Sequence, residues 1–511
     1  MTGSGSEPQP DSGPFPLLQI SRRPLTGWAA TGLSLIAGAV TVLAFAPFNL
    51  FLLAPLGLAL WFALLPGSRP GIGFRHGFAF GLGLFGFGVS WIFNSLLIFG
   101  QAPWLVASLI TVLFVLYLAL YPALLAFLLL RSLGGAPLLP WLLALAAGFT
   151  LLEWVRGWFL SGFPWLLFGH VLLDSPARAW LPVAGESGGT LLLALLAVAL
   201  VLVAARRYLP AAVLVAGLVG AWLLVQPWRW VEPVGEPISV AVVQGNIEQA
   251  RKWEDDGIPH ALEIYMGMSR QVAGADLLVW PETAIPAFYF EVYQDLEPFA
   301  AALGAQGTEL VTGIFDYDPV DRSMYNSIRH IPSGATYDKR QLVPFGEYLP
   351  LRRRLLWLDR LLDIPMSDLT PGTGAGQVAM AGHVAGLTVC YEAAYARRIR
   401  TALPEAGLLL NVSNDAWFGP TLAPHQHLQI ARVRALEMGR PMIRATNTGI
   451  SALIDAQGRL TAVAGLFTRE VLQGPVQPYR GLTAAARLGH WPALVMALLL
   501  LLPALRRRRR A

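Results

Sequence analysis

Long apolar runs are the feature that most constrains how this chain can fold. They occupy residues 25–230 and 488–505, and several are long enough to cross a bilayer, which takes about 20 apolar residues per helix. Over the whole chain 55% of the residues are hydrophobic and only 14% are charged, which is too apolar for an ordinary soluble enzyme. Residues 237–480, by contrast, carry charges, turns and short strand-like runs. The sequence therefore predicts a membrane all-α bundle with one inserted soluble domain.

The apolar runs divide into about eight membrane-spanning helices, seven before the soluble domain and one after it. We expect these helices at about residues 27–46, 49–66, 74–99, 103–131, 137–156, 187–205, 210–228 and 488–505. The second run is short enough to be tilted or re-entrant. Residues 1–24 are rich in Gly, Ser and Pro and are expected to be disordered. They lack the basic start and apolar core of a cleaved signal peptide, so we expect the first helix to act as an uncleaved signal.

Basic residues indicate the orientation of the bundle. They lie before the first run, in alternate loops and after the last run: Arg22, Arg23, Arg69, Arg75, Arg131, Arg206, Arg207 and Arg506 to Arg510. With eight spans, every cluster falls on one side, which the positive-inside rule assigns to the cytoplasm. Both termini, including the basic tail 506–511, are then cytoplasmic, and the soluble domain lies in the periplasm of a bacterial inner membrane. The net charge of +5 suits anionic lipid headgroups, and no nucleic-acid recognition motif accompanies it.

The soluble stretch alternates strand-like and helix-like segments. Strand-like runs occur at residues 238–247, 276–281, 309–315, 327–331, 383–390 and 407–414. Helix-like stretches occur at 260–273 and 427–440, and residues 442–449 and 451–460 are expected to pair as a hairpin. Such alternation predicts a layered α/β domain, and about 240 residues is a reasonable size for one domain.

Residues capable of chemistry follow several of these strands. Glu282 follows an apolar run, Lys339 follows the short segment "ATYD", and Cys390, the only cysteine, ends another run. A carboxylate can accept a thiol proton, and an ammonium can stabilise the oxyanion that forms when a thiolate attacks an acyl carbon. Together the three make a set for acyl transfer that needs no cofactor. Taken alone, the cysteine is more typical of a small buried residue than of a nucleophile.

Three other features favour structural interpretations. "GLGLFG" at residues 81–86 matches the dinucleotide-binding fingerprint but lies inside an apolar run, so we interpret it as small residues that let helices pack closely. The pair His425 and His427 lacks the further ligands that a zinc site needs, and we expect a turn there, before a helix that starts near His427. Glu153 and Arg156 lie one turn apart at the end of the fifth run and are expected to pair.

Several motifs occur together in the order found in a known family. They are "VVQGNIEQARKWED" (242–255), "WPETAIP" (280–286), "YNS" (325–327), "YDKRQLVPFGEYLP" (337–350), "VCYE" (389–392), "NVSNDAWFG" (411–419) and "RATNTGIS" (444–451). These motifs resemble the nitrilase superfamily and, within it, the bacterial apolipoprotein N-acyltransferases. The layout of eight spans with a domain between the seventh and the eighth is similar as well, so the resemblance covers nearly the whole chain.

The resemblance implies a fold, a reaction and a set of site residues. The fold would be an α-β-β-α sandwich. The reaction would move an acyl chain from a phospholipid, through a thioester, to the amino group of the N-terminal diacylglyceryl-cysteine of a lipoprotein. In the matching motifs Glu282 is the general base, Lys339 the lysine and Cys390 the nucleophile. Glu347 matches a second glutamate, Trp253 lies in the "KW" motif near the lipid-binding mouth, and Tyr391 and Glu392 follow the nucleophile as they do in the family.

Two other functions stay open on the residues alone. A nitrilase-like amidase would deliver the thioester to water, although a soluble amide needs no platform of eight spans. A transporter or scaffold would need no acyl-transfer set, and transport predicts ionisable residues within the spans, which are poor in them. "LRRRLLWLDRLLDIP" (351–365) is expected to be an interfacial amphipathic segment, with an ordinary surface helix as the alternative. The aromatic stretch 286–293 suits a lipid-facing surface and core packing equally.

Overall fold

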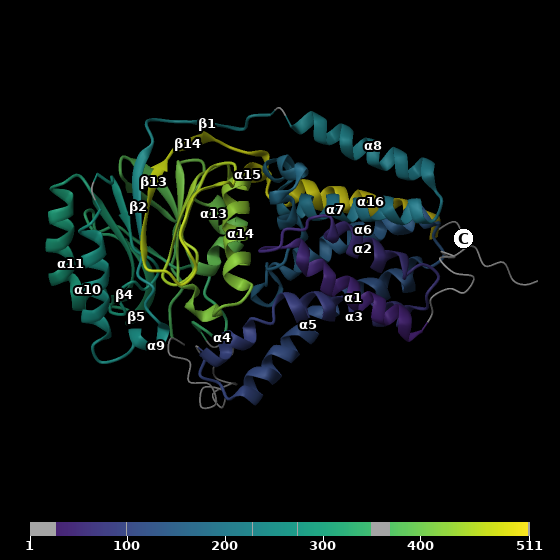
Figure 1. The fold of residues 1–511 in the computed structure, drawn as a ribbon. Coiled ribbons are helices and arrows are strands. Elements are labelled where there is room, and N and C mark those ends of the chain that lie inside the picture. Colours follow the sequence, from purple (N-terminus) through teal and green to yellow (C-terminus); the bar gives the residue numbers. More distant parts are fainter. Residues whose placement is uncertain (1–26, 99, 227, 273, 349–367, 509–511) are drawn as a thin grey trace, which may run out of the picture.

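The computed structural model describes residues 27–508 except 99, 227, 273 and 349–367. It has two parts, a helical bundle and an α/β domain that is stacked on one end of the bundle (Figure 1). The chain builds most of the bundle first, then the domain, and finally returns to the bundle with its last helix. The segment 351–365, for which an interfacial helix was expected, lies outside the described residues.

Helices occupy each of the eight apolar runs. They are α1 (Trp28–Thr41) with η1 (Val42–Ala44), α2 (Leu53–Ala63), α3 (Pro70–Gly88) with α4 (Ile92–Ile98), α5 (Trp104–Leu133), α6 (Leu138–Arg156), α7 (Leu181–Ala204), α8 (Tyr208–Val225) and α16 (Trp491–Arg508). Among the described residues, four helices are long and apolar enough to cross a membrane, and the pair α3 and α4, bent by 45°, makes a fifth candidate. Helices α1, α2 and α16 are apolar but shorter, so the count of eight spans stays a prediction.

Glycine lets the first helices of the bundle approach closely. A Cβ atom at Gly83 would lie 2.0 Å from the carbonyl oxygen of Leu35 in α1, and one at Gly81 would lie 2.6 Å from the Cα of Ala119 in α5. A Cβ at Gly86 would meet nothing closer than 4.0 Å. The interpretation of "GLGLFG" as a packing motif is therefore confirmed for two of its three glycines, since only Gly can stand where backbones touch.

The α/β domain contains two six-stranded sheets. In the first, the strand order is β13 (Glu470–Val476), β2 (Ile238–Gln244), β3 (Leu277–Val279), β4 (Glu309–Asp318), β5 (Ser323–His330) and β6 (Thr336–Asp338). In the second, it is β12 (Leu460–Val463), β11 (Ala452–Ile454), β10 (Met442–Thr446), β9 (Leu408–Ser413), β8 (His383–Val389) and β7 (Gln377–Met380). Each sheet has a parallel centre, β2-β3-β4 and β8-β9-β10, and its remaining pairs are antiparallel. The expected hairpin-like pair is β10 with β11.

The two sheets pack face to face between two layers of helices. Apolar residues of both sheets form one core between them. Helices α10 (Gly257–Ser269) and α11 (Tyr289–Gly304) cover the outer face of the first sheet, and α13 (Ala396–Arg400) and α14 (Ala423–Met438) cover the second. This is the α-β-β-α order that the resemblance implied. Helix α14 was expected to start near His427. That expectation is wrong, because α14 begins at Ala423 with Pro424 in its first turn.

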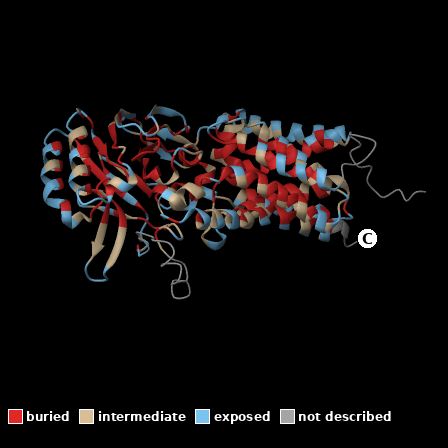
Figure 2. Ribbon diagram, turned by 60° about the horizontal axis from the view of Figure 1, so that its bottom comes forward, coloured by how far each residue is buried: buried red, intermediate tan, exposed pale blue. Residues whose placement is uncertain are grey.

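Helix α14 joins the domain to the bundle. Its residues Ile430, Val433 and Leu436 belong to the same apolar core as the bundle helices, while other residues of α14 pack under the second sheet. In Figure 1 this helix lies between the sheets and the ends of the bundle helices. Figure 2 shows buried residues running through the centres of both parts and across the junction. The strands of the second sheet, which carry the cysteine, are therefore held directly against the bundle.

Candidate active site

The three residues predicted to act in acyl transfer come from the ends of strands in both sheets. Glu282 follows β3 and Lys339 follows β6 in the first sheet, and Cys390 follows β8 in the second. Each is buried, with exposed fractions of 5%, 1% and 9%. Strand ends collect reactive residues in layered α/β folds, because the loops there are free to present side chains to one place.

Lys339 is the centre of a buried charge cluster. Its Nζ lies 2.7 Å from Oε1 of Glu347 and 3.5 Å from Oε1 of Glu282. Burial by itself lowers the pKa of Lys339, but the carboxylates of Glu347 and Glu282 outweigh that effect and raise the pKa above its ordinary value. The side chain is therefore an ammonium at neutral pH, and the carboxyl groups of Glu282 and Glu347 both lie beside it.

Glu282 is fixed by two donors from different elements. The side-chain amide of Asn326 on β5 donates to Oε1 at 2.8 Å, and the backbone N–H of Asn414 after β9 donates to Oε2 at 2.8 Å. Gly313 on β4 makes room for this arrangement, since a Cβ there would lie 2.6 Å from the Cα of Glu282. The carboxylate thus has one defined position in contact with both sheets.

Cys390 sits on a sharp turn. Its φ of +52° lies in the left-handed region, which a residue with a side chain seldom adopts, and it begins the short helix η5 (Cys390–Ala394). Burial, and after it the charge of Glu282, raise the pKa of the Cys390 thiol, whereas Lys339 lowers it. The resting thiol is therefore protonated, and attack on an acyl group requires a base to take its proton during the reaction.

The carbonyl of Cys390 is held by two side chains that the sequence did not single out for this role. The side-chain amide of Asn411 donates to it at 3.3 Å, and Nε2 of His427 lies 3.3 Å from it. His427 Nδ1 lies 3.0 Å from Asp415, which also pairs with Arg444 at 2.8 Å. Burial and then Arg444 lower the pKa of His427, so the ring is neutral at pH 7. The sequence had indicated only a turn at His425 and His427, with no role beside the cysteine.

Glu392 has a different place from the one that its position next to the nucleophile suggests. Its side chain is fully buried and accepts four hydrogen bonds within the protein. The donors are the backbone N–H groups of Arg340 and Gln341 at 2.8 and 2.9 Å, the Tyr337 hydroxyl at 2.7 Å and the Val389 N–H at 2.8 Å. The carboxylate therefore ties the loop that carries Lys339 to the strand that carries Cys390.

The two predicted aromatic residues lie on different sides of the cluster. Tyr391 packs toward the bundle, with its ring centroid 6.0 Å from that of Trp165 and 5.2 Å from that of Tyr395. Trp253 ends the short helix α9 (Gln249–Lys252), is 48% exposed, and lies 6.3 Å from the Phe315 ring. Trp253 is therefore open to solvent, whereas Tyr391 packs against the apolar core at the junction of the domain and the bundle.

Lys252, immediately before this tryptophan, was missed. It is only 2% exposed, and its Nζ donates to the carbonyl of Thr283 at 2.8 Å, one residue beyond Glu282.

No group of three or more His, Cys, Asp or Glu residues that could hold a metal ion occurs in the described part of the chain. The chemistry that these side chains offer is nucleophilic attack by a thiol, with a carboxylate base and an ammonium beside it.

Comparisons with known proteins show which families this chain is similar to. The profile of the apolipoprotein N-acyltransferase N-terminal domain matches residues 37–199, and that of carbon-nitrogen hydrolase matches residues 239–485. The chain is 43% identical to the apolipoprotein N-acyltransferase of Methylococcus capsulatus over 90% of this chain and 93% of that protein. It is 39% identical to that of Pseudomonas syringae pv. tomato over 93% and 96%. A solved structure from Saccharomyces cerevisiae, a member of branch 10 of the nitrilase superfamily, is 18% identical, covers 48% of this chain and 92% of that chain, and has a TM-score of 0.36.

Proposed function

This chain belongs to the apolipoprotein N-acyltransferase family, and from that membership we propose how its own residues carry out the transfer. It is an enzyme that N-acylates lipoproteins, with a phospholipid as the general class of acyl donor. The residue assignment rests on the contact of the buried Lys339 with the buried Glu282 and Glu347, together with the effect of the Glu282 and Lys339 charges on Cys390, the only cysteine in the sequence. Glu282, Lys339 and Cys390 are the proposed catalytic residues.

In the first half-reaction the Sγ of Cys390 attacks the carbonyl carbon of a phospholipid ester. Glu282 accepts the thiol proton as the S–C bond forms, because the resting thiol is protonated. The oxygen of the tetrahedral intermediate becomes negative, and the ammonium of Lys339 stabilises it in a buried site where little water screens the interaction. The C–O bond then breaks, and the lysophospholipid oxygen takes the proton from Glu282. A thioester on Cys390 remains.

In the second half-reaction the α-amino group of the lipoprotein cysteine attacks that thioester. Glu282 accepts a proton from the amine, the N–C bond forms and the C–S bond breaks, and the thiolate of Cys390 takes the proton back. Glu347 holds Lys339 at 2.7 Å throughout and keeps it charged. Trp253 and Tyr391, which lie outside the charged cluster, are proposed to contact the acyl chains.

Intact mass spectrometry tests the first half-reaction. After incubation of the purified protein with a phospholipid, we expect a mass gain of one acyl chain that hydroxylamine removes and that Cys390→Ser lacks. Glu282→Gln is expected to form the adduct at least a hundredfold more slowly, in line with the usual contribution of a general base. A folded protein that forms no adduct would remove the thioester mechanism. Addition of a diacylglyceryl-cysteine peptide then separates transfer to an amine from hydrolysis.

The finer membrane arrangement is also a proposal. All eight apolar segments, α3 with α4 counted as one, are proposed to span the membrane, with the catalytic domain in the periplasm and both termini in the cytoplasm. Two observations support it. The C-terminal end of α16 lies at the opposite end of the bundle from the domain (Figure 1), and Arg75 on α3 contacts Gly27 and Trp28 at the start of α1.

Reporter fusions after Ala511 test this orientation. Alkaline phosphatase needs periplasmic disulfide formation, so its fusion is expected to be inactive, while a fluorescent protein that folds in the cytoplasm is expected to fluoresce. An active phosphatase fusion would place the C-terminus on the other side and contradict the eight-span arrangement.

A further inference from the structure

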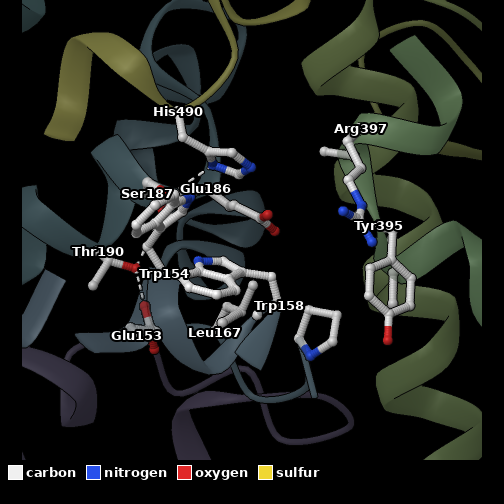
Figure 3. Close-up of a pocket in the computed structure, with 14 residues that line it drawn as sticks. Glu153, Trp154, Trp158, Leu167, Glu186, Ser187, Thr190, Tyr395, Arg397 and His490 are labelled. Carbon is white, nitrogen blue, oxygen red and sulfur yellow. Dashed lines mark hydrogen bonds between the residues drawn. The ribbon is translucent and has the colours of Figure 1, made fainter. Parts of the chain in front are cut away.

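A cavity of about 270 Å³ lies at the junction of the bundle and the catalytic domain, away from the reactive cysteine. Its walls come from the ends of α6 and α7, from the start of α16 and from α13, and Cys390, Glu282 and Lys339 do not line it. Figure 3 shows Glu186 and His490 on the bundle side, with Tyr395 and Arg397 on the facing wall that the domain supplies. Such a volume is slightly below that of pockets for drug-sized ligands and suits a small polar group.

The bundle wall carries a buried carboxylate, that of Glu186 on α7. Its Oε2 pairs with the guanidinium of Arg434, which also pairs with Glu437 on α14 behind the wall. Oε2 of Glu186 is occupied by His170 and Arg434, but its Oε1 has no hydrogen-bond partner in the described part of the chain. A cation in the cavity would find an unpaired carboxylate oxygen there.

Aromatic rings extend this cation site. Trp154 and Trp158 line the cavity, and their ring centroids lie 5.4 Å apart at an interplanar angle of 63°. The rings pack edge to face, and we call this pair the Trp154–Trp158 corner. It lines the same cavity as Glu186, and an ammonium group interacts favourably with an aromatic face that stays open to the cavity.

The opposite wall offers a site for an anion. Arg397 is exposed, donates to Gln341 at 3.2 Å, and lies with its guanidinium carbon 5.8 Å from the centroid of the Tyr395 ring. A guanidinium has five N–H donors, so this contact leaves donors for a phosphate. The cavity thus pairs an acidic, aromatic side with a basic side.

The cavity lies beside an apolar tip that suits the membrane interface. Trp158, Phe159 and Leu160 follow the end of α6 and are 45%, 46% and 72% exposed. Exposed Trp and Phe at the end of a spanning helix are typical of the headgroup region of a bilayer. A ligand would therefore reach the cavity from the lipid layer.

We propose that this cavity binds the headgroup of a zwitterionic phospholipid with a primary ammonium. The ammonium lies against Glu186 and the Trp154–Trp158 corner, and the phosphate lies against Arg397. This lipid is separate from the acyl donor, since its site does not include the reacting residues, and it bridges the bundle and the domain.

Native mass spectrometry of full-length Cys390→Ser tests the proposal, because this variant binds lipid without turning it over. With phosphatidylethanolamine we expect a junction adduct that phosphatidylglycerol of the same chains forms at least fivefold more weakly, because it has no cation. Trp158→Ala and Arg397→Gln are each expected to weaken this adduct about fivefold or more. Neither change is expected to affect a lipid bound at the acyl-transfer site. The test can therefore contradict the proposed junction site without contradicting the proposed acyl-transfer reaction.

Matched controls keep the test specific. Phe290→Ala removes an exposed aromatic on α11, and Arg487→Gln removes an exposed arginine on α15. Neither residue lines the cavity. Both controls are expected to retain the adduct. Equal binding of the two lipids, or equal loss in Phe290→Ala and Trp158→Ala, would overturn the proposal. Glycerophosphoethanolamine, which lacks acyl chains, should compete only weakly, and competition as strong as that of the lipid would identify a soluble phosphate as the ligand instead.

Discussion

At the scale of single residues, Lys252 has the most unusual environment next to the site. Its ammonium is buried and has one hydrogen bond, to the carbonyl of Thr283, whose φ of +47° marks a sharp turn directly after Glu282. Burial lowers the pKa of Lys252 to about 7, although the charge of Glu282 acts in the opposite direction. The side chain therefore holds the turn that positions Glu282. Its charged form is less stable there than in water, because burial removes its hydration.

This shift predicts a pH dependence of stability. Between about pH 7 and the ordinary lysine value of about 10.4, the unfolded chain binds a proton that the folded protein has lost, so the stability of the protein rises with pH. Lys252→Met lacks this contribution. We measure melting temperatures by tryptophan fluorescence in detergent. The difference between the wild-type value and the Lys252→Met value is expected to shift in favour of the wild type from pH 7 to pH 9.5. Arg251→Met, at the exposed neighbouring position, should run parallel to the wild type. Parallel curves for Lys252→Met as well would show that the lysine stays charged.

At the scale of secondary-structure elements, Glu392 couples two loops that are 52 positions apart in the chain. Its four donors come from the segment after β6 and from the end of β8, so Lys339 and Cys390 share one support. A glutamine could not accept all four bonds, because its NH₂ group would face donors. Glu392→Gln should cost about 1–3 kcal/mol of stability for a donor left unpaired. Small displacement of Lys339 should also slow thioester formation by about tenfold to a hundredfold.

Two measurements separate this support from a direct chemical role. The rate of thioester formation that remains in Glu392→Gln should depend on pH in the same way as the wild-type rate. The reason is that Glu392 exchanges no proton with the substrate. Glu405→Gln, at an exposed carboxylate that accepts one bond from Gln377 at 3.1 Å, should change stability by no more than about 0.5 kcal/mol. A shifted pH profile in Glu392→Gln would instead assign that residue a part in proton transfer.

The elements themselves were largely predictable, and their supporting contacts were not. Apolar runs, strand alternation and motif order predicted the apolar helices, most strands and the residues Glu282, Lys339 and Cys390. These depend on local pattern or on a motif that stays together in the chain. The roles of Lys252, His427 and Glu392 arise from contacts that join residues 31 to 52 positions apart, which no local pattern reveals. Strands such as β7 and β12 were missed because each is four residues long.

At the scale of the whole molecule, the domain and the bundle are joined through charged groups as well as an apolar core. Arg434 on α14 is fully buried and pairs with Glu437 on its own helix and with Glu186 on α7. It also donates to the carbonyl of Ala393, in the turn that begins at Cys390, at 3.1 Å. One guanidinium thus connects the turn that begins at Cys390 to helix α7, so the position of Cys390 relative to the bundle depends on it.

Two substitutions on helix α14 distinguish this buried contact from a peripheral one. Arg434→Met leaves two buried carboxylates without a cation and should destabilise the protein by about 3–5 kcal/mol. Arg432→Met breaks the partly exposed pair with Asp174, at 2.7 Å, and should cost no more than about 1 kcal/mol. Thermal unfolding measures both. If the cost in Arg434→Met comes from uncompensated charge, then adding Glu186→Gln and Glu437→Gln should recover much of it, because neutral amides need no counterion. No recovery would mean that the loss lies in the hydrogen bond to Ala393 and in packing, and that the junction depends on shape more than on charge.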